Sequence, residues 1–126
     1  MAEGEFDMLA ASLRADLRDL GAFLEALAAK LEGALPGRAK IKRHSTALLH
    51  GQKRVQKLQL DCGEYRFRLD FDGTTLKARR SFLSNGVALR TDTLSIEQWI
   101  DDLAHWLTVE AKQSEQGRLA LQQLLD

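Results

Sequence analysis

The sequence contains one cysteine, one proline and one tyrosine, and aromatic residues make up 6% of its 126 positions. With a single thiol, Cys62, no disulfide can form within the chain, which favours a reducing compartment. One proline among 44% hydrophobic residues argues against a disordered chain. No apolar run is long enough to span a bilayer and the first residues are acidic, so we expect neither a transmembrane helix nor a signal peptide. These features predict a cytoplasmic protein.

The charges cancel overall but are sorted along the chain. Residues 38–90 hold thirteen Lys and Arg against four acids, a net charge of +9. Residues 1–37 carry −4 and residues 91–126 carry −5. A basic middle between two acidic ends predicts a surface that binds something anionic.

The two ends have helical patterns. Apolar residues three and four apart predict one helix over residues 5–32, about 40 Å long, which Gly33 and Pro36 then end. At the other end, Ser95 and Gln98 have the spacing of a capping box and begin a second helix. Gly117 leaves open whether this last helix is continuous or split.

Three turn signals divide the middle into strands. Gly63-Glu64 predicts a type II′ turn, while Asp72-Gly73 and Asn85-Gly86 predict type I′ turns. A further strand over 39–45 is expected to place Ile41 beside Leu60. With two-residue loops throughout, one sheet face is apolar and packs against helix residues. The predicted core is Leu58, Leu60, Phe67, Leu69, Phe82 and Leu89 against Leu17, Leu24, Trp99, Ile100 and Leu103.

These elements predict a single α+β domain over residues 1–126. The expected architecture is a five-stranded antiparallel meander sheet, in the order α-β-β-β-β-β-α, with the N-terminal and C-terminal helices packed on one face.

The opposite face of this sheet is predicted to be rich in cations. Like charges are expected directly opposite each other in the pairs Arg66–Arg79 and Arg68–Lys77, which is mildly destabilising without a partner. One interpretation is an ordinary solvated face, since Lys and Arg discourage aggregation of sheets. The other is a recognition surface for an acidic partner protein, formed by Lys40, Lys42, Lys57, Arg66, Arg68, Lys77, Arg79 and Arg90.

Nucleic acid is the alternative partner for this face. Proteins that bind single strands stack bases on exposed aromatic rings. The predicted register places Tyr65, Phe67, Phe71 and Phe82 on the apolar face instead, and no RNA-binding or zinc-finger motif occurs. An acidic protein is therefore favoured over nucleic acid.

Catalytic and metal-binding motifs are lacking. His44, His50 and His105 do not have the spacing of metal ligands, and no phosphate loop or dinucleotide-binding motif occurs. The sequence thus predicts no enzyme, no metal and no cofactor. Arg80 is the one charged residue on the apolar face, predicted opposite Tyr65 and Thr91. It is expected either to reach the edge of the sheet or to pair with a helix acid such as Asp16 or Asp102. In an open pocket it would instead bind a small anion, which is the third functional alternative.

The helix ends also predict self-association. A 40 Å helix is longer than seven-residue strands of about 23 Å, so both helix ends need cover. They either cover each other within one chain or are buried in a two-fold dimer. The residues concerned are Phe6, Leu9, Leu13, Leu121 and Leu125. We therefore expect a non-catalytic protein–protein interaction or adaptor module that forms a homodimer.

Overall fold

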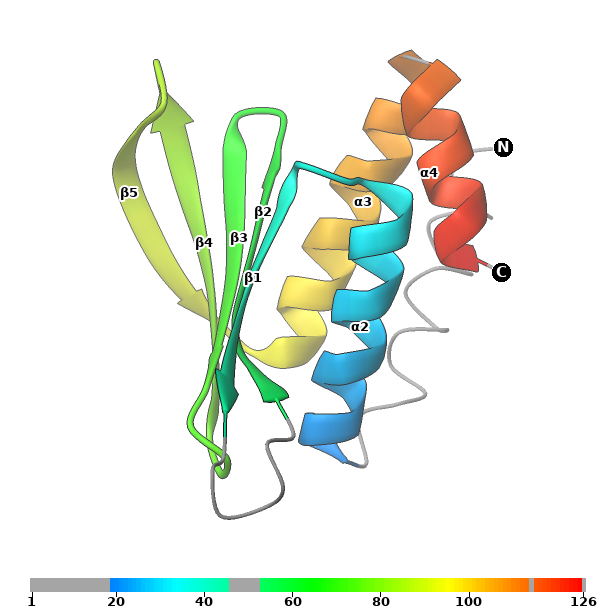
Figure 1. Cartoon of the computed structure of the whole chain (residues 1–126). Coiled ribbons are helices and arrows are strands. Elements are labelled where there is room, and N and C mark those ends of the chain that lie inside the picture. Colours follow the sequence, from blue (N-terminus) through cyan, green and yellow to red (C-terminus); the bar gives the residue numbers. More distant parts are fainter. Residues whose placement is uncertain (1–18, 46–52, 114, 126) are drawn as a thin grey trace.

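The computed structural model describes residues 19–45, 53–113 and 115–125 of the chain. Within these ranges, an antiparallel sheet of five strands, in the order β1-β2-β3-β4-β5, is preceded by one helix and followed by two (Figure 1). This is the predicted α+β architecture. In chain order the elements are α2 (Leu20–Ala34), β1 (Ala39–Ser45), β2 (Lys53–Cys62), β3 (Tyr65–Phe71), β4 (Leu76–Ser84), β5 (Val87–Leu94), α3 (Ile96–Gln113) and α4 (Glu115–Leu125).

All three helices lie on one side of the sheet (Figure 1). Alternate residues of β2 and β3 are apolar and point to that side, and Phe67 at the centre of β3 is fully buried. Its ring meets Trp99 of α3 edge to face, with centroids 5.8 Å apart. The indole N–H of Trp99 donates to the carbonyl oxygen of Arg79 at 3.1 Å, so its one polar atom is satisfied. The predicted core residues Leu24, Leu58, Leu60, Leu69, Ile100 and Leu103 are buried with them.

The prediction of one helix through residues 5–32 is wrong at Asp19. The backbone of Asp19 is extended (φ −124°, ψ 105°), and its carboxylate accepts a hydrogen bond from the Ala22 amide at 3.1 Å. An aspartate in this position is a helix N-cap, so α2 begins at Leu20 and is shorter than a 40 Å helix. Leu17 and the rest of residues 1–18 lie outside the described residues.

The C-terminal part of the chain begins its first helix as expected and forms two helices. The Ser95 hydroxyl accepts a hydrogen bond from the Gln98 amide at 3.1 Å, as in the predicted cap. Helix α3 ends at Gln113, and Gly117 lies within α4. Among the described residues, no helix combines the length and the apolarity needed to cross a membrane.

Two of the three hairpin turns have the predicted form. Cys62 pairs with Tyr65 across Gly63-Glu64, with a positive φ at Gly63 only, and Ser84 pairs with Val87 across Asn85-Gly86, with positive φ at both turn residues. The prediction of a two-residue turn at Asp72-Gly73 is wrong, because the β3–β4 loop contains four residues, 72–75.

The side chain of Asp72 explains the longer loop. Its carboxylate accepts hydrogen bonds from the amides of Thr74 and Thr75 at 2.9 and 2.7 Å, closing an Asx-type turn. These donors hold the pKa of Asp72 below its usual range. The register of β4 consequently shifts by two residues, so that Leu69 lies opposite Ala78 and Phe67 opposite Arg80.

Irregularities in the strand register correct two further predictions. Between β4 and β5, Leu83 pairs with Ala88 and Phe82 with Arg90, so Leu89 is an extra residue. Leu89 is 64% exposed and is not in the core. Between β1 and β2, Gln56 is extra and Ile41 lies beside Leu58 rather than Leu60.

Replacing Phe67 by alanine is expected to lower the free energy of unfolding by about 3–5 kcal/mol, because it leaves a cavity against Trp99. Leu89→Ala is the matched control and should change it by less than about 0.5 kcal/mol, since this side chain is mostly in solvent. Urea unfolding of both variants measures the difference. Equal losses would mean that the assignment of the two residues to core and surface is incorrect.

Candidate partner-binding face

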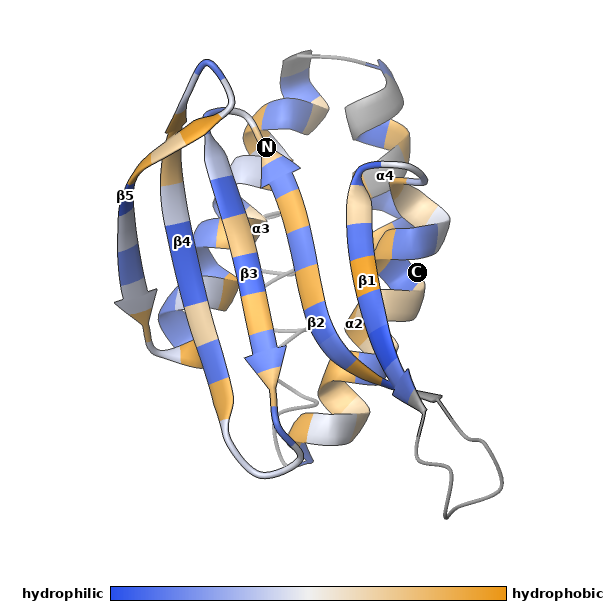
Figure 2. Ribbon diagram, turned by 60° about the vertical axis from the view of Figure 1, so that its left-hand side comes forward, coloured by the Kyte–Doolittle hydropathy of each residue, from blue (hydrophilic) through white to orange (hydrophobic). Residues whose placement is uncertain are grey.

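The sheet face opposite the helices carries most of the cations of the strands. Strand residues alternate between the two faces, and Figure 2 shows this face in front, with α2 and α3 behind it. Cross-strand pairing places Lys42, Lys57, Asp70 and Lys77 in one row. We use the name basic face for Lys40, Lys42, Lys57, Arg66, Arg68, Lys77 and Arg79, together with Asp61 and Asp70.

The like-charge neighbours on the basic face differ from the predicted ones. Because of the four-residue loop, Arg68 lies opposite Arg79, whereas Arg66 lies opposite Ser81 and Lys77 opposite Asp70. Lys42 and Lys57 form a second like-charge pair, between β1 and β2. Like charges in direct opposition repel each other, so the face retains the property that suggested recognition, at different residues.

Arg90 is not part of the basic face. The extra residue Leu89 reverses the alternation in β5, so Arg90 pairs with Phe82 and projects to the helix side of the sheet. Its guanidinium lies 3.4 Å from the carboxylate of Asp92. The prediction of Arg90 on the partner-binding face is therefore wrong. Ser81 on that face lies opposite Thr91, with their hydroxyls 2.8 Å apart.

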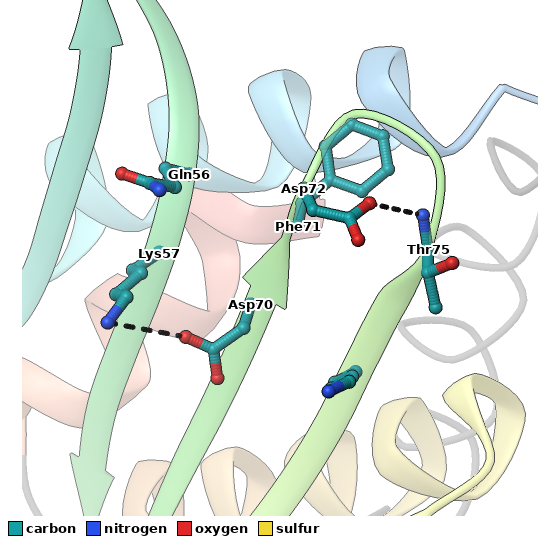
Figure 3. A pocket seen from close by; sticks show the side chains of 7 residues that line it. Gln56, Lys57, Asp70, Phe71, Asp72 and Thr75 are labelled. Carbon is teal, nitrogen blue, oxygen red and sulfur yellow. Dashed lines mark hydrogen bonds and ion pairs between the residues drawn. The ribbon is translucent and has the colours of Figure 1, made fainter.

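The two acids of the basic face neutralise it only in part. Asp61 holds Arg66 through two hydrogen bonds, from Nε at 2.8 Å and from a terminal nitrogen at 3.1 Å. Asp70 lies between two cations, 4.0 Å from Lys57 (Figure 3) and 3.9 Å from Arg79. Both separations exceed hydrogen-bond distance, so neither cation is tightly held.

A shallow hollow of about 160 Å³ lies beside Asp70. Figure 3 shows Lys57 on β2 and Asp70 on β3 directed toward each other at its edge. The buried Oδ2 of Asp70 accepts no hydrogen bond from the described residues. The hollow therefore has room for solvent next to an incompletely satisfied carboxylate. The residues that line it are Gln56, Lys57, Asp70, Phe71, Asp72, Thr75 and Lys77.

In the described structure, three cations of the basic face have neither an ion pair nor an acid directly opposite them, whereas Lys77, also without an ion pair, lies opposite Asp70. Among the described residues, no carboxylate lies within ion-pair distance of Lys40, Lys42 or Arg68. Lys40 and Lys42 are exposed, and Arg68 is half-buried between Gln59 and Arg79. These three side chains hold the positive charge that an anionic partner would find.

Two cations on the helix side, Arg38 and Arg43, are by contrast paired with acids of the helices. Arg38 binds Glu110 of α3 at 2.6 Å and donates to the carbonyl of Asp61 at 2.9 Å. Arg43 at the sheet edge pairs with Glu32 of α2, and this contact lowers the pKa of Glu32. Among the described residues, the acids near the two ends of the sequence thus neutralise cations on the helix side of the sheet, and they do not reach the cations of the basic face.

Arg80 is an anchor between the sheet and α3. It lies opposite Phe67 and Asp92 rather than Tyr65 and Thr91, because of the corrected registers. The predicted ion pair with Asp102 is confirmed, and Asp92 is the second carboxylate at 3.5 Å. Its guanidinium also lies 5.2 Å from the ring centroid of Tyr65. Two carboxylates already satisfy this cation, which disfavours the small-anion alternative.

The residues expected to mediate self-association divide into two groups. Phe6, Leu9 and Leu13 lie outside the described residues. Leu121 is 4% exposed and Leu125 is half-buried, because α4 packs on α2 and α3 of the same chain. Leu121 therefore has no exposed surface to offer a second copy in this conformation.

Aromatic side chains are on the wrong side of the sheet for stacking on nucleic acid bases. Tyr65 and Phe82 lie opposite each other on the helix side, with ring centroids 5.6 Å apart. Phe67 and Phe71 share that side by alternation. The basic face is flat and cationic without an aromatic platform in the described strands.

Cys62 is buried and weakly acidic. Its thiol donates to the Glu110 carboxylate at 3.6 Å, and burial together with that negative charge raises its pKa to about 12. A thiol in this state is a poor nucleophile. Within the described ranges, no three His, Cys, Asp or Glu side chains gather as a metal site would require.

Comparison with models of known protein families, with characterised proteins and with solved structures finds no match. The function therefore has to be inferred from the surfaces of this chain.

The raised pKa of Cys62 predicts a change of stability with pH. The neutral thiol is favoured in the folded state, so its contribution is complete below the ordinary pKa of 9.0 and is lost as pH rises toward about 12. Between these values wild type should lose about 1.4 kcal/mol per pH unit relative to Cys62→Ala. Urea unfolding of both proteins from neutral to alkaline pH measures the difference. Parallel profiles would contradict a buried thiol.

Proposed function

We propose that this protein is a non-catalytic protein–protein interaction module whose basic face binds an acidic segment of a partner protein. The observation that carries the proposal is the set of three cations, Lys40, Lys42 and Arg68, without an acidic neighbour in the described structure. Their charges lie on one flat face built from adjacent strands. A partner that supplies carboxylates there would relieve the repulsion in the like-charge pairs.

An acidic protein fits this face better than a nucleic acid does. The aromatic rings that would stack on bases lie on the helix side. Phosphate contacts alone remain, and the net formal charge of the chain is zero. Nucleic acid is accordingly the competing outcome of the test below.

Two further properties belong to the same proposal. The buried, unreactive thiol of Cys62 suits a reducing compartment, and we place the protein in the cytoplasm. Self-association is the other property, and it would give each assembly more than one basic face.

The double variant Lys42→Glu/Arg68→Glu should reduce binding of an acidic peptide by about tenfold or more, because it reverses two cations whose loss breaks no ion pair among the described residues. Fluorescence anisotropy with a labelled Glu- and Asp-rich peptide measures the loss. The matched control is Lys30→Glu/Lys112→Glu, which makes the same charge change on α2 and α3, also breaks no ion pair among the described residues, and should bind as wild type does.

Three results would count against the proposal: unchanged binding by a folded Lys42→Glu/Arg68→Glu protein, equal loss in the control, or tighter binding of a single-stranded oligonucleotide than of a peptide of equal charge. The third result would favour the nucleic-acid alternative. Affinity capture from the native host, with wild type and both double variants side by side, would then identify the partner by mass spectrometry.

Asp70→Asn should act in the opposite direction and strengthen binding of the same peptide. It removes the acid that lies between Lys57 and Arg79 without changing the shape of the side chain. We expect an increase of about two- to fivefold, the effect of one unit charge several ångströms away in a well-solvated surface. The increase should shrink at high salt. Weaker binding by a folded Asp70→Asn protein would place the peptide elsewhere.

A further inference from the structure

Strand β5 forms an open edge of the sheet. Among the described residues its only neighbouring strand is β4, and both ribbon views show it at the far edge from β1 (Figures 1 and 2). One side of its backbone therefore has N–H and C=O groups free to pair with another strand. Val87 and Leu89 on this strand are 60% and 64% exposed, the highest values among the large hydrophobic side chains of the described residues. The edge thus combines backbone pairing capacity with apolar surface.

The other edge, β1, is protected by its charges. It carries Lys40, Lys42, Arg43 and His44, all exposed, and no acid. Pairing β1 with a second β1 would place like charges beside each other, which is a known protection of sheet edges. β5 lacks this protection, since its two charged residues are Arg90 and Asp92, of opposite sign.

We propose that β5 pairs antiparallel with β5 of a second copy, so that the two sheets form one continuous sheet of ten strands. The two-fold axis passes between Thr91 of one copy and Thr91 of the other. This inference deepens the self-association part of the proposed function, and it does not depend on what the basic face binds.

The charges of β5 select this register. In a continuous sheet with all helices on one side, the axis has to pass between one residue and the same residue of the second copy, so that each side chain faces one on the same sheet face. An axis at Thr91 places Arg90 opposite Asp92 of the second copy, and Asp92 opposite its Arg90. An axis at Arg90 or at Asp92 would oppose two like charges instead.

The side chains involved are available for this contact. Arg90 and Asp92 are 67% and 40% exposed and lie 3.4 Å apart on the helix side of the sheet. In the pair of copies, two arginines and two aspartates would alternate around the axis. The ladder is regular from Arg90 to Leu94, so the central pairs avoid the extra residue at Leu89. Leu89 would then lie beside Thr93 of the second copy, which would cover part of its exposed surface.

Substitution at the axis tests both the pairing and its register. In the Thr91→Lys dimer and in the Thr91→Glu dimer, two side chains of the same charge would face each other across the axis. Each variant alone should therefore be monomeric. An equimolar mixture places opposite charges there and should restore the dimer. Thr91→Val, which loses only the hydroxyl bond to Ser81, is the matched control and should dimerise as wild type does. Sedimentation velocity over a wide concentration range measures the mass against 14.1 kDa for one chain.

A second variant tests the same pairing without a substitution at Thr91, so the test does not depend on whether the Thr91 variants fold. Arg90→Glu opposes two acids across the axis and should also weaken the dimer, while circular dichroism verifies that each variant is folded. Wild type that stays near 14.1 kDa at all concentrations would overturn the proposal, as would a dimer unaffected by Thr91→Lys and Arg90→Glu. The Lys42→Glu/Arg68→Glu variant should remain dimeric, so loss of peptide binding and loss of pairing are separate results.

Discussion

The packing of one sheet face against α2 and α3 is the constraint on which the rest of this structure depends. Phe67 and its neighbours on β2 and β3 are fully buried against Trp99 and Leu24. Because all three helices lie on that side, no element of the described chain covers the other face. Alternation then requires that every second strand residue be compatible with water. The one-sided core thus decides which residues can take part in recognition.

Charge is distributed according to the same constraint. The acids of α2 and α3 reach the cations at the rim of the sheet, as in the pairs Glu32–Arg43, Glu110–Arg38 and Asp102–Arg80. They cannot reach across the sheet to its opposite face. A sequence that is neutral overall therefore folds into a protein with a paired helix side and an excess of positive charge on the basic face. The separation of acidic and basic residues along the chain thus becomes a separation between the helix side and the basic face of the sheet.

Several parts of the fold that depend on a few adjacent residues were predicted correctly from the sequence. The Ser95 cap, the Gly63 and Asn85-Gly86 turns and the strand at 39–45 all follow from a few adjacent residues, and they occur as expected. The β3–β4 loop was missed because a register shift of two residues leaves every side chain on the same face, so the hydrophobic pattern cannot detect it. The signal that was available is Asp72, whose side chain can close a loop with the amides of Thr74 and Thr75.

Other errors came from features without a pattern of their own. An extra residue in a strand has no distinctive hydrophobicity, so apolar Leu89 was placed in the core and Arg90 on the wrong face. Asp19 interrupts a leucine stripe that continues on both sides of it, and its role as a cap depends on its own backbone conformation. Membership of the basic face survived in β1–β4, because those errors preserved alternation. The like-charge pairs did not survive, since they depend on the register itself.

The two proposed surfaces gain from each other through simple geometry. A two-fold axis perpendicular to a continuous sheet keeps both basic faces on the same side of it. Exposed ion pairs are individually weak, about 0–1 kcal/mol each, so a single face with three cations that lack an acidic neighbour in the described structure binds an acidic segment only modestly. A partner long enough to reach both faces would meet the second at a high effective concentration, and its overall affinity would rise without any new kind of contact. Pairing through β5 would therefore raise the affinity for such a partner even though each ion pair on the basic face is weak.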